Sequence, residues 1–114
     1  MIAVIFEVYP NKERKQEYLD IAATLREELD DIDGFISIER FASLSEEDKV
    51  LSLSFWRDEA SIEKWRNLEL HRQAQSKGRE GIFRNYRIRV ADVSRDYGMR
   101  NRSETPDDSI KNHG

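Results

Sequence analysis

The alternation of side-chain types is clearest in residues 50–65, which read VLSLSFWRDEASIEKW. Between Val50 and Trp56, leucine or phenylalanine alternates with serine or tryptophan, which is the period of a β-strand. Asp58 is placed to cap a helix. Beyond it the period changes, because Ile62 and Trp65 are three residues apart. The stretch predicts a strand that leads directly into a helix, which we expect to run to about residue 77, either continuous or with a break near Asn67.

Three elements are predicted before this stretch. Residues 2–9 are rich in Ile, Val, Phe and Tyr, which favours a strand that ends at Pro10. Residues 12–32 have apolar side chains three or four apart, which predicts a helix with one apolar face. Asp33-Gly34 is a turn signal, and residues 35–41 read as a second strand. The apolar helix positions are Tyr18, Ile21, Ala22, Leu25, Leu29 and Ile32.

One long strand and a polar tail are predicted after it. Residues 82–93 form the last strand, in which Tyr86, Ile88 and Val90 alternate with two arginines. Residues 98–114 hold no aromatic side chain and cannot bury enough surface to offset the entropy lost on ordering. We expect a domain over residues 1–97 and a C-terminal tail over 98–114 that is flexible or lies over a partner.

The predicted order is therefore β-α-β-β-α-β. This order indicates an α+β, ferredoxin-like fold, an antiparallel sheet with both helices on one face. The other face carries Ile5, Phe41 and Val93 among polar residues. A second copy of the chain covers such a face most simply, so we expect a homodimer.

Composition excludes several classes of function. The formal charge is −4, so the electrostatic attraction needed for non-specific nucleic-acid binding is missing. The absence of cysteine excludes disulfides, thiol catalysis and Cys-based metal sites. His71 and His113 are the only histidines and His113 is in the tail, so we expect no metal. No signal peptide or membrane span is apparent, and we expect a cytoplasmic protein that does not bind membranes.

Four segments, in this order, resemble the antibiotic biosynthesis monooxygenase family. Asp33-Gly34-Phe35 is similar to the turn before the family's second strand. Residues 55–66, FWRDEASIEKWR, resemble its passage from third strand to helix. Residues 70–80, LHRQAQSKGRE, are similar to its "EH…AQ…GR" segment. Tyr86 to Ala91, followed by Arg95-Asp96-Tyr97, resembles its closing strand.

This resemblance implies a dimeric α/β barrel with a pocket between sheet and helices in each subunit. The family includes cofactor-free oxygenases of polyketide-derived phenols, haem-degrading enzymes and enzymes that act on a signalling molecule. The resemblance thus implies a cofactor-independent monooxygenase that uses dioxygen on a small aromatic or polyketide-like compound. The alternative is a small-ligand-binding or stress-related protein without catalysis, since a fold implies a pocket rather than a chemistry.

Seven residues are candidates for the site. Trp65 is either a pocket wall that stacks on a flat substrate or a core aromatic. His71 is either a general base or a surface histidine. It lies about 240° around a continuous helix from Trp65, so the two share a face only if the helix breaks. With Tyr86, these form the candidate catalytic set. The candidate substrate-binding residues are Arg79, Gln75, Phe6 and Trp56, of which Trp56 is alternatively a dimer contact.

The haem-degrading branch of the family is the less favoured reading. Its pattern is an Asn on the first strand, a helical Trp and a haem-ligating His ten residues after that Trp. Trp65 fits this pattern, but Phe6 and Gln75 occupy the other two positions. We therefore expect no cofactor, with haem as the alternative if His71 replaces the missing ligand.

Overall fold

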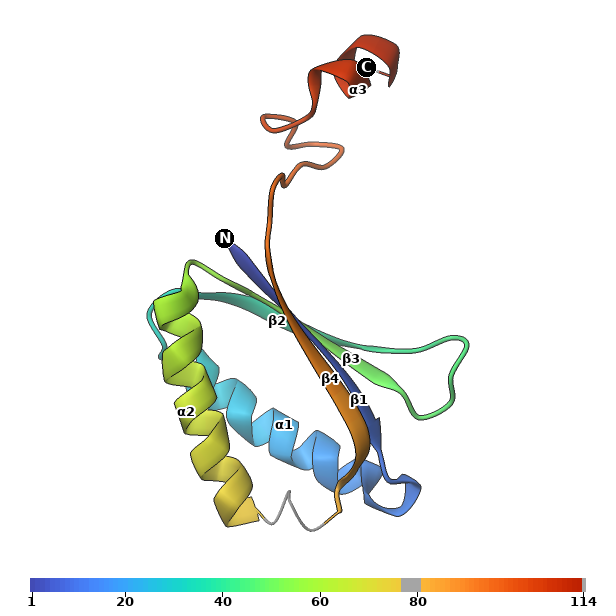
Figure 1. Ribbon diagram of the computed structural model, residues 1–114, viewed down its shortest axis with the longest axis vertical. Coiled ribbons are helices and arrows are strands. Elements are labelled where there is room, and N and C mark those ends of the chain that lie inside the picture. Colours follow the sequence, from blue (N-terminus) through green and yellow to red (C-terminus); the bar gives the residue numbers. More distant parts are fainter. Residues whose placement is uncertain (77–80, 114) are drawn as a thin grey trace.

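The computed structural model describes residues 1–76 and 81–113 of the chain, and it has the predicted element order (Figure 1). The first strand is followed by a short 3-10 helix and then the first α-helix. The last described element is a short helix in the predicted tail. The elements are β1 (Ile2–Pro10), η1 (Lys12–Arg14), α1 (Lys15–Leu29), β2 (Phe35–Ala42), β3 (Val50–Trp56), α2 (Glu59–Ser76), β4 (Phe83–Asp92) and α3 (Asp107–His113).

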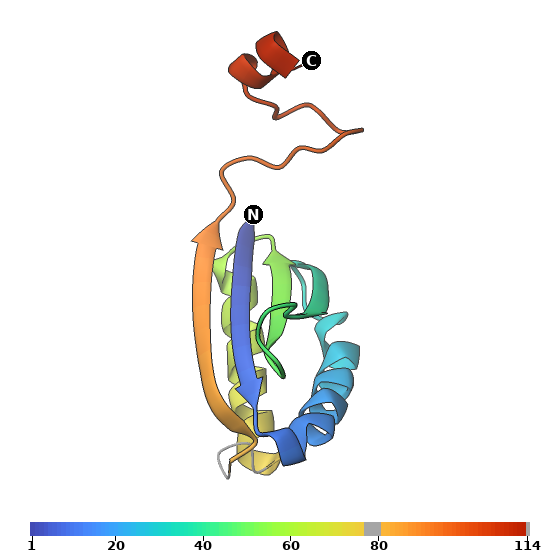
Figure 2. The same ribbon diagram turned by 90° about the vertical axis from the view of Figure 1, so that its right-hand side faces the viewer.

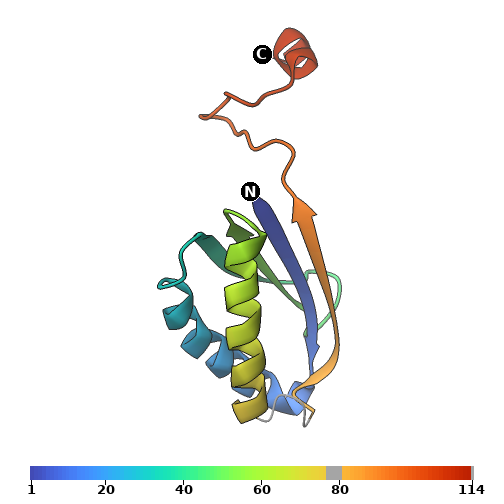
Figure 3. The ribbon, with the colours of Figure 1, turned by 60° about the vertical axis from the view of Figure 1, so that its left-hand side comes forward.

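The four strands form one antiparallel sheet in the order β2-β3-β1-β4. Helices α1 and α2 lie on the same face of this sheet, and the opposite face has no helix over it (Figure 3). The fold is therefore α+β and ferredoxin-like, as the sequence predicts. An antiparallel sheet tolerates one packed and one open face because its side chains alternate between them.

The strand register decides which side chains lie under the helices. On β1, Ile2, Val4, Phe6 and Val8 are buried, and they pair with Trp56, Ser54, Ser52 and Val50 of β3. The helices thus cover the serine-bearing face of β3. Its leucine-bearing face, with Leu51, Leu53 and Phe55, forms the open side of the sheet together with Ala3, Ile5 and Glu7 of β1.

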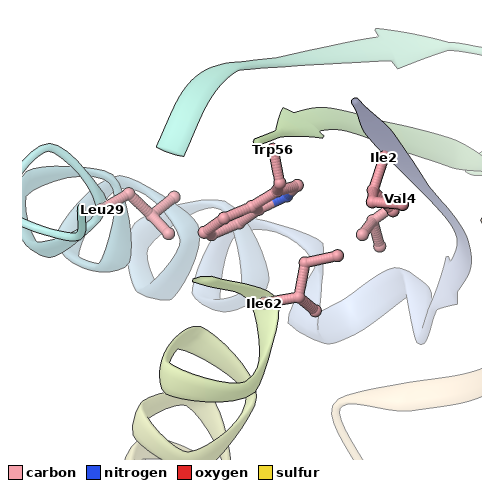
Figure 4. Close-up of a cluster of buried hydrophobic side chains, with 5 residues drawn as sticks. All are labelled: Ile2, Val4, Leu29, Trp56 and Ile62. Carbon is pink, nitrogen blue, oxygen red and sulfur yellow. The ribbon is translucent and has the colours of Figure 1, made fainter. Parts of the chain in front are cut away.

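Two apolar clusters form the core between sheet and helices. The first, shown in Figure 4, joins Trp56 to side chains from β1, α1 and α2: Ile2, Val4, Leu29 and Ile62. The second lies at the other end of the sheet and contains Phe6, Val8, Tyr18, Val50 and Ile82. Both helices are therefore fixed to the sheet by apolar burial, which is the main stabilising term in a domain of this size.

Residues beyond 93 leave the sheet as an arm. The last backbone contact with β1 is Val93 N–H to Met1 C=O at 3.0 Å. Figures 1 and 2 show the following segment extending away from the domain, with α3 at its far end. The Cα radius of gyration is 16.7 Å, against about 13 Å for a compact chain of this length. The arm has turns of its own, including Gly98 N–H to Asn101 C=O at 2.7 Å.

Candidate functional site

The helix-covered face of the sheet has a polar strip at its centre. Ser52 and Ser54 on β3 are 5% and 3% exposed, in positions that apolar side chains usually occupy. Buried hydroxyl groups need hydrogen-bond partners. Ser54 has one, because its Oγ accepts a hydrogen bond of 2.9 Å from Trp56 Nε1. Ser52 pairs with Phe6 of the second cluster and Ser54 with Val4 of the first, so the two serines lie where the two apolar clusters meet.

Two tryptophans lie beside this strip. Trp56 is fully buried at the end of β3, and Trp65 on α2 is half-buried and packs against the same cluster. Their ring centroids are 5.8 Å apart. The two indole N–H groups differ: that of Trp56 donates to Ser54, whereas that of Trp65 is buried and has no hydrogen-bond partner among the described residues. A buried donor without an acceptor is uncommon in native proteins and calls for an explanation.

A second buried donor without an acceptor belongs to Arg40 on β2. The register pairs Arg40 with Ser52, and Ile38, two residues earlier on the same strand, packs against the first cluster. Arg40 therefore lies on the helix-covered face. Its Nε is buried and has no hydrogen-bond partner in the part of the chain that the structure describes. The polar strip thus has an unsatisfied donor on each side, one from β2 and one from α2.

An aromatic group continues this face towards β4. Phe6 contacts Tyr86 edge-on at 5.8 Å between ring centroids and Phe83 at 6.2 Å. Tyr86 is 56% exposed, and the next two side chains on its face, Ile88 and Val90, are each 47% exposed. Among the described side chains, β4 is therefore left largely uncovered on the face that carries Phe6.

The structure brings four of the seven predicted residues to one face of the sheet. Phe6, Trp56 and Tyr86 project from the sheet towards the helices, and Trp65 projects from α2 against Trp56. Trp56 is fully buried in the core of the single chain. The side chains of His71 and Gln75, and the whole of Arg79, lie outside the described residues. Helix α2 is continuous from Glu59 to Ser76, so of the two possibilities for this helix the unbroken one is observed.

Sequence reasoning missed Arg40, Ser52 and Ser54. Alternation along β3 identifies two faces but does not say which one the helices cover. Trp56 could have indicated the covered face. It lies on the same face as the two serines and is the largest side chain of that strand, so its burial would place this face under the helices.

A polar clamp fixes the start of α2, and with it the position of Trp65. Asp58 Oδ1 accepts hydrogen bonds from Ser61 N–H at 3.0 Å and Ser61 Oγ at 2.7 Å, which caps the helix. These hydrogen bonds, together with Arg57, lower the pKa of Asp58 from 3.8 to about 2. Arg57 also pairs bidentately with Asp33 at 3.1 Å for both contacts and lowers the pKa of that carboxyl.

The same clamp needs Gly34 in the turn before β2. Its φ of +94° is a conformation that side chains disfavour, and a Cβ there would lie 1.8 Å from Ser61 Oγ. Gly34 C=O accepts the backbone N–H of Arg57 at 2.8 Å. The loop before β2 and the start of α2 are therefore held as one unit.

The open face of the sheet carries a separate cavity of about 400 Å³. It lies where β1, β2 and β3 meet the base of the arm, and its lining is mainly apolar. The lining residues are Met1, Ile36, Ser37, Phe55, Val93, Arg95 and Asp96. Ile36 projects here because a β-bulge shifts the register between Phe35 and Ser37.

The described part of the chain has neither a metal cluster nor a membrane helix. Among the side chains that the structure describes, no three His, Asp or Glu residues lie together as a metal site requires. None of the helices there combines the length and the apolarity that a bilayer crossing requires.

Comparison with known proteins gives a match to a family and a relative of high sequence identity. The model of the family described as "antibiotic biosynthesis monooxygenase" matches residues 1–77. A protein of Pyricularia oryzae named jasmonate monooxygenase ABM is 50% identical over 94 residues, which is 82% of this chain. The chain spans 44% of the length of that relative.

Solved structures support the fold. A putative antibiotic biosynthesis monooxygenase from Deinococcus radiodurans superposes with a TM-score of 0.74 at 12% identity, covering 87% of this chain and 98% of the other. SnoaB from Streptomyces nogalater, described as a cofactor-independent oxygenase, superposes with a TM-score of 0.69 at 7% identity, covering 83% and 94%. At these identities the likeness concerns the fold alone.

Proposed function

Because the chain belongs to the antibiotic biosynthesis monooxygenase family, we propose that it is a monooxygenase of a small, mainly apolar organic compound bound between the sheet and the helices. The observation that carries this proposal is the buried, unpartnered N–H of Trp65 beside the polar strip of Ser52 and Ser54. A donor held without an acceptor in a water-poor interior suits a carbonyl or ionised oxygen of a bound substrate.

Two substrate classes follow from different arguments. The resemblance to phenol oxygenases favours a small aromatic or polyketide-like compound, on which Trp65, Phe6 and Tyr86 would stack. The relative that is 50% identical is named for jasmonate, a cyclopentanone with a carboxylate side chain. Identity at that level outweighs the 7% to SnoaB, so we propose a jasmonate-like cyclic ketone acid as the first class to test.

The chemistry requires little from the protein if the substrate itself supplies the electrons. An ionised, electron-rich ring reacts with dioxygen directly. In the reaction a CH₂ group of the substrate ring is oxidised to a ketone. One oxygen atom of dioxygen becomes the ketone oxygen, and the other leaves as water with the two hydrogens of the CH₂ group. No external reductant is then needed. The residues of the site bind, orient and stabilise the anion. In this scheme Trp65 donates to the ionised oxygen, and Tyr86 is the candidate for moving the proton. His71 follows Trp65 by six residues on the continuous helix α2, and therefore lies on another side of it.

Oxygen uptake by the purified full chain tests the proposal. Jasmonate, hydroxynaphthalenes and anthrones are supplied in turn without added cofactor. Each reaction is run under labelled dioxygen, and its products are analysed by mass spectrometry. We expect substrate-dependent uptake and one labelled oxygen in the product. Binding without uptake for every compound would favour the non-catalytic ligand-binding alternative. Uptake only after addition of haem and a reductant, with a Soret shift that His71→Ala abolishes, would favour the haem-degrading one.

We also propose that the chain acts as a homodimer. Support comes from the open face of the sheet, where Ile5, Leu51, Leu53 and Phe55 are only half-buried and Phe41 is 42% exposed. An apolar sheet face of this kind calls for a covering surface. A second copy supplies a self-complementary one through two-fold symmetry.

A further inference from the structure

We propose that Arg40 is the residue that binds the carboxylate of an organic-acid substrate. This inference rests on the proposed function and extends it by assigning the recognition of the acid group. It is carried by the placement of Arg40 on the helix-covered face and by the buried, unpartnered state of its Nε.

The strand register directs Arg40 inward. From Ser37 to Ala42 the pairing of β2 with β3 is regular, so alternate residues share a face. Ile38 packs against the first core cluster, and Arg40 follows it on that face, opposite the buried Ser52. Glu39, the acid next to it in sequence, lies on the open face opposite Leu53. Arg40 therefore lies away from the acidic neighbour that would most simply neutralise it.

Several other arginines of the described chain have acidic partners. Arg26 pairs with Asp30, Arg57 with Asp33 and Asp58, and Arg89 with Glu7. Arg40 is half-buried, yet in the described ranges its buried Nε donates to nothing. A guanidinium group cannot shed its charge in a protein. A partly desolvated arginine with an unused donor is therefore a site that favours an anion, and a carboxylate matches the planar fork through two parallel hydrogen bonds.

The rest of this face suits the apolar part of such an acid. Arg40, Ser52, Phe6 and Ile88 form one row across the four strands. Adjacent strands are ~4.8 Å apart, so the row spans ~14 Å from Arg40 to Ile88. It changes from cationic through a small hydroxyl to aromatic and aliphatic side chains. Ser52 and Phe6 are 5% and 8% exposed, whereas Arg40 is half-buried and Ile88 is 47% exposed. The two ends of the row are therefore the positions open to the carboxylate and to the apolar end of such a ligand.

Binding of an acid and of its neutral ester distinguishes this role from a structural one. The full chain is titrated with jasmonate and with its methyl ester, and binding is followed by the fluorescence of Trp56 and Trp65. We expect the wild type to prefer the acid, and Arg40→Gln to lose about tenfold or more of its affinity for the acid with little change for the ester. Arg40→Lys should keep part of the preference because it keeps the charge.

Arg100→Gln removes the same charge from the exposed arm and serves as the matched control, with the acid preference unchanged. Thermal unfolding of each variant verifies folding, and Arg40→Lys carries the test if Arg40→Gln does not fold. The inference is overturned if the wild type does not prefer the acid, or if Arg40→Gln weakens acid and ester equally. Because binding needs no turnover, an acid preference that depends on Arg40 with no oxygen uptake would refute the proposed function and leave this inference standing. With turnover, Arg40→Gln should raise KM for the acid much more than it lowers kcat.

Discussion

Trp56 and Trp65 have neighbouring rings but opposite polar environments. The Trp56 N–H is satisfied by Ser54, so this residue completes the core. The Trp65 N–H donates to no acceptor among the described residues, so this residue is the better candidate for contact with a substrate. Replacement of each by phenylalanine removes the same N–H group and allows the two roles to be compared.

We predict that Trp65→Phe lowers kcat/KM by about 10²-fold, the usual effect of removing a donor to a developing oxyanion. Its melting temperature should fall less than that of Trp56→Phe, because Trp65 is only half-buried and its N–H makes no hydrogen bond to the described residues. Trp56→Phe should instead lower the free energy of unfolding by about 1–3 kcal/mol, through lost volume in the core and an unpartnered Ser54. Oxygen uptake and urea unfolding measure the two effects. An unchanged kcat/KM in Trp65→Phe would show that the indole N–H does not contact the reacting group.

At Gly34, both the backbone conformation and the close packing against Ser61 require a residue without a side chain. Gly34→Ala places a methyl group against Ser61 Oγ in a backbone conformation unfavourable for alanine. We expect a loss of about 1–3 kcal/mol in the free energy of unfolding. Gly98→Ala is the matched control, because nothing lies within 4 Å of a Cβ at that position. Equal stability of the two variants in urea would mean that the turn before β2 relaxes at no cost.

At the scale of elements, the start of α2 depends on the ionised form of Asp58. Its pKa is lowered from 3.8 to about 2 by the hydrogen bonds from Ser61 and by Arg57. A lowered pKa in the folded state stabilises the fold above pH 3.8, and this stabilisation is lost as the pH falls towards about 2. Arg57 also lowers the pKa of Asp33. Ionised Asp33 therefore stabilises the fold in the same direction, and this stabilisation is likewise lost at low pH.

We therefore predict that Asp58→Asn flattens the dependence of melting temperature on pH between 4 and 2 relative to the wild type. At neutral pH the variant should melt a few degrees lower, because the ion pair with Arg57 is lost. Asp31→Asn, at an exposed carboxyl, serves as the control and should keep the slope of the wild type. Parallel curves for wild type and Asp58→Asn would contradict the assignment of this pH dependence to the helix cap.

The elements themselves were predictable because each has a period of its own. Residues 2–9 and 50–56 alternate, and residues 15–29 repeat every three or four positions, so strands and helices follow from local pattern. The site was less predictable because it depends on register between strands. That Arg40 lies opposite Ser52, and that the serine face of β3 lies under the helices, are consequences of long-range pairing that alternation cannot supply.

At the scale of the whole molecule, the two faces of the sheet carry different side chains and we propose different roles for them. The helix-covered face holds the core and the proposed site, and the open face is apolar at its centre with charged side chains on β1 and β4. Glu7 and Arg89 form one such pair at 3.4 Å. The arm leaves the domain beside the cavity of the open face, to which Arg95 and Asp96 contribute. A partner on that face would therefore lie close to the base of the arm.

Leu53 at the centre of the open face provides the test of dimer formation. It pairs with Ile5 of β1 and Glu39 of β2 and points away from the helices. We expect the wild type to have twice the mass of one chain in light scattering, and Leu53→Lys to have the mass of one, because a buried unpaired ammonium opposes association. Ala23→Lys, an equivalent exchange on the exposed surface of α1, should remain dimeric. The helix-covered face is intact in both variants, so far-UV circular dichroism should match the wild type. A wild-type mass of one chain would refute the homodimer. A dimer that survives Leu53→Lys would place the association on another surface.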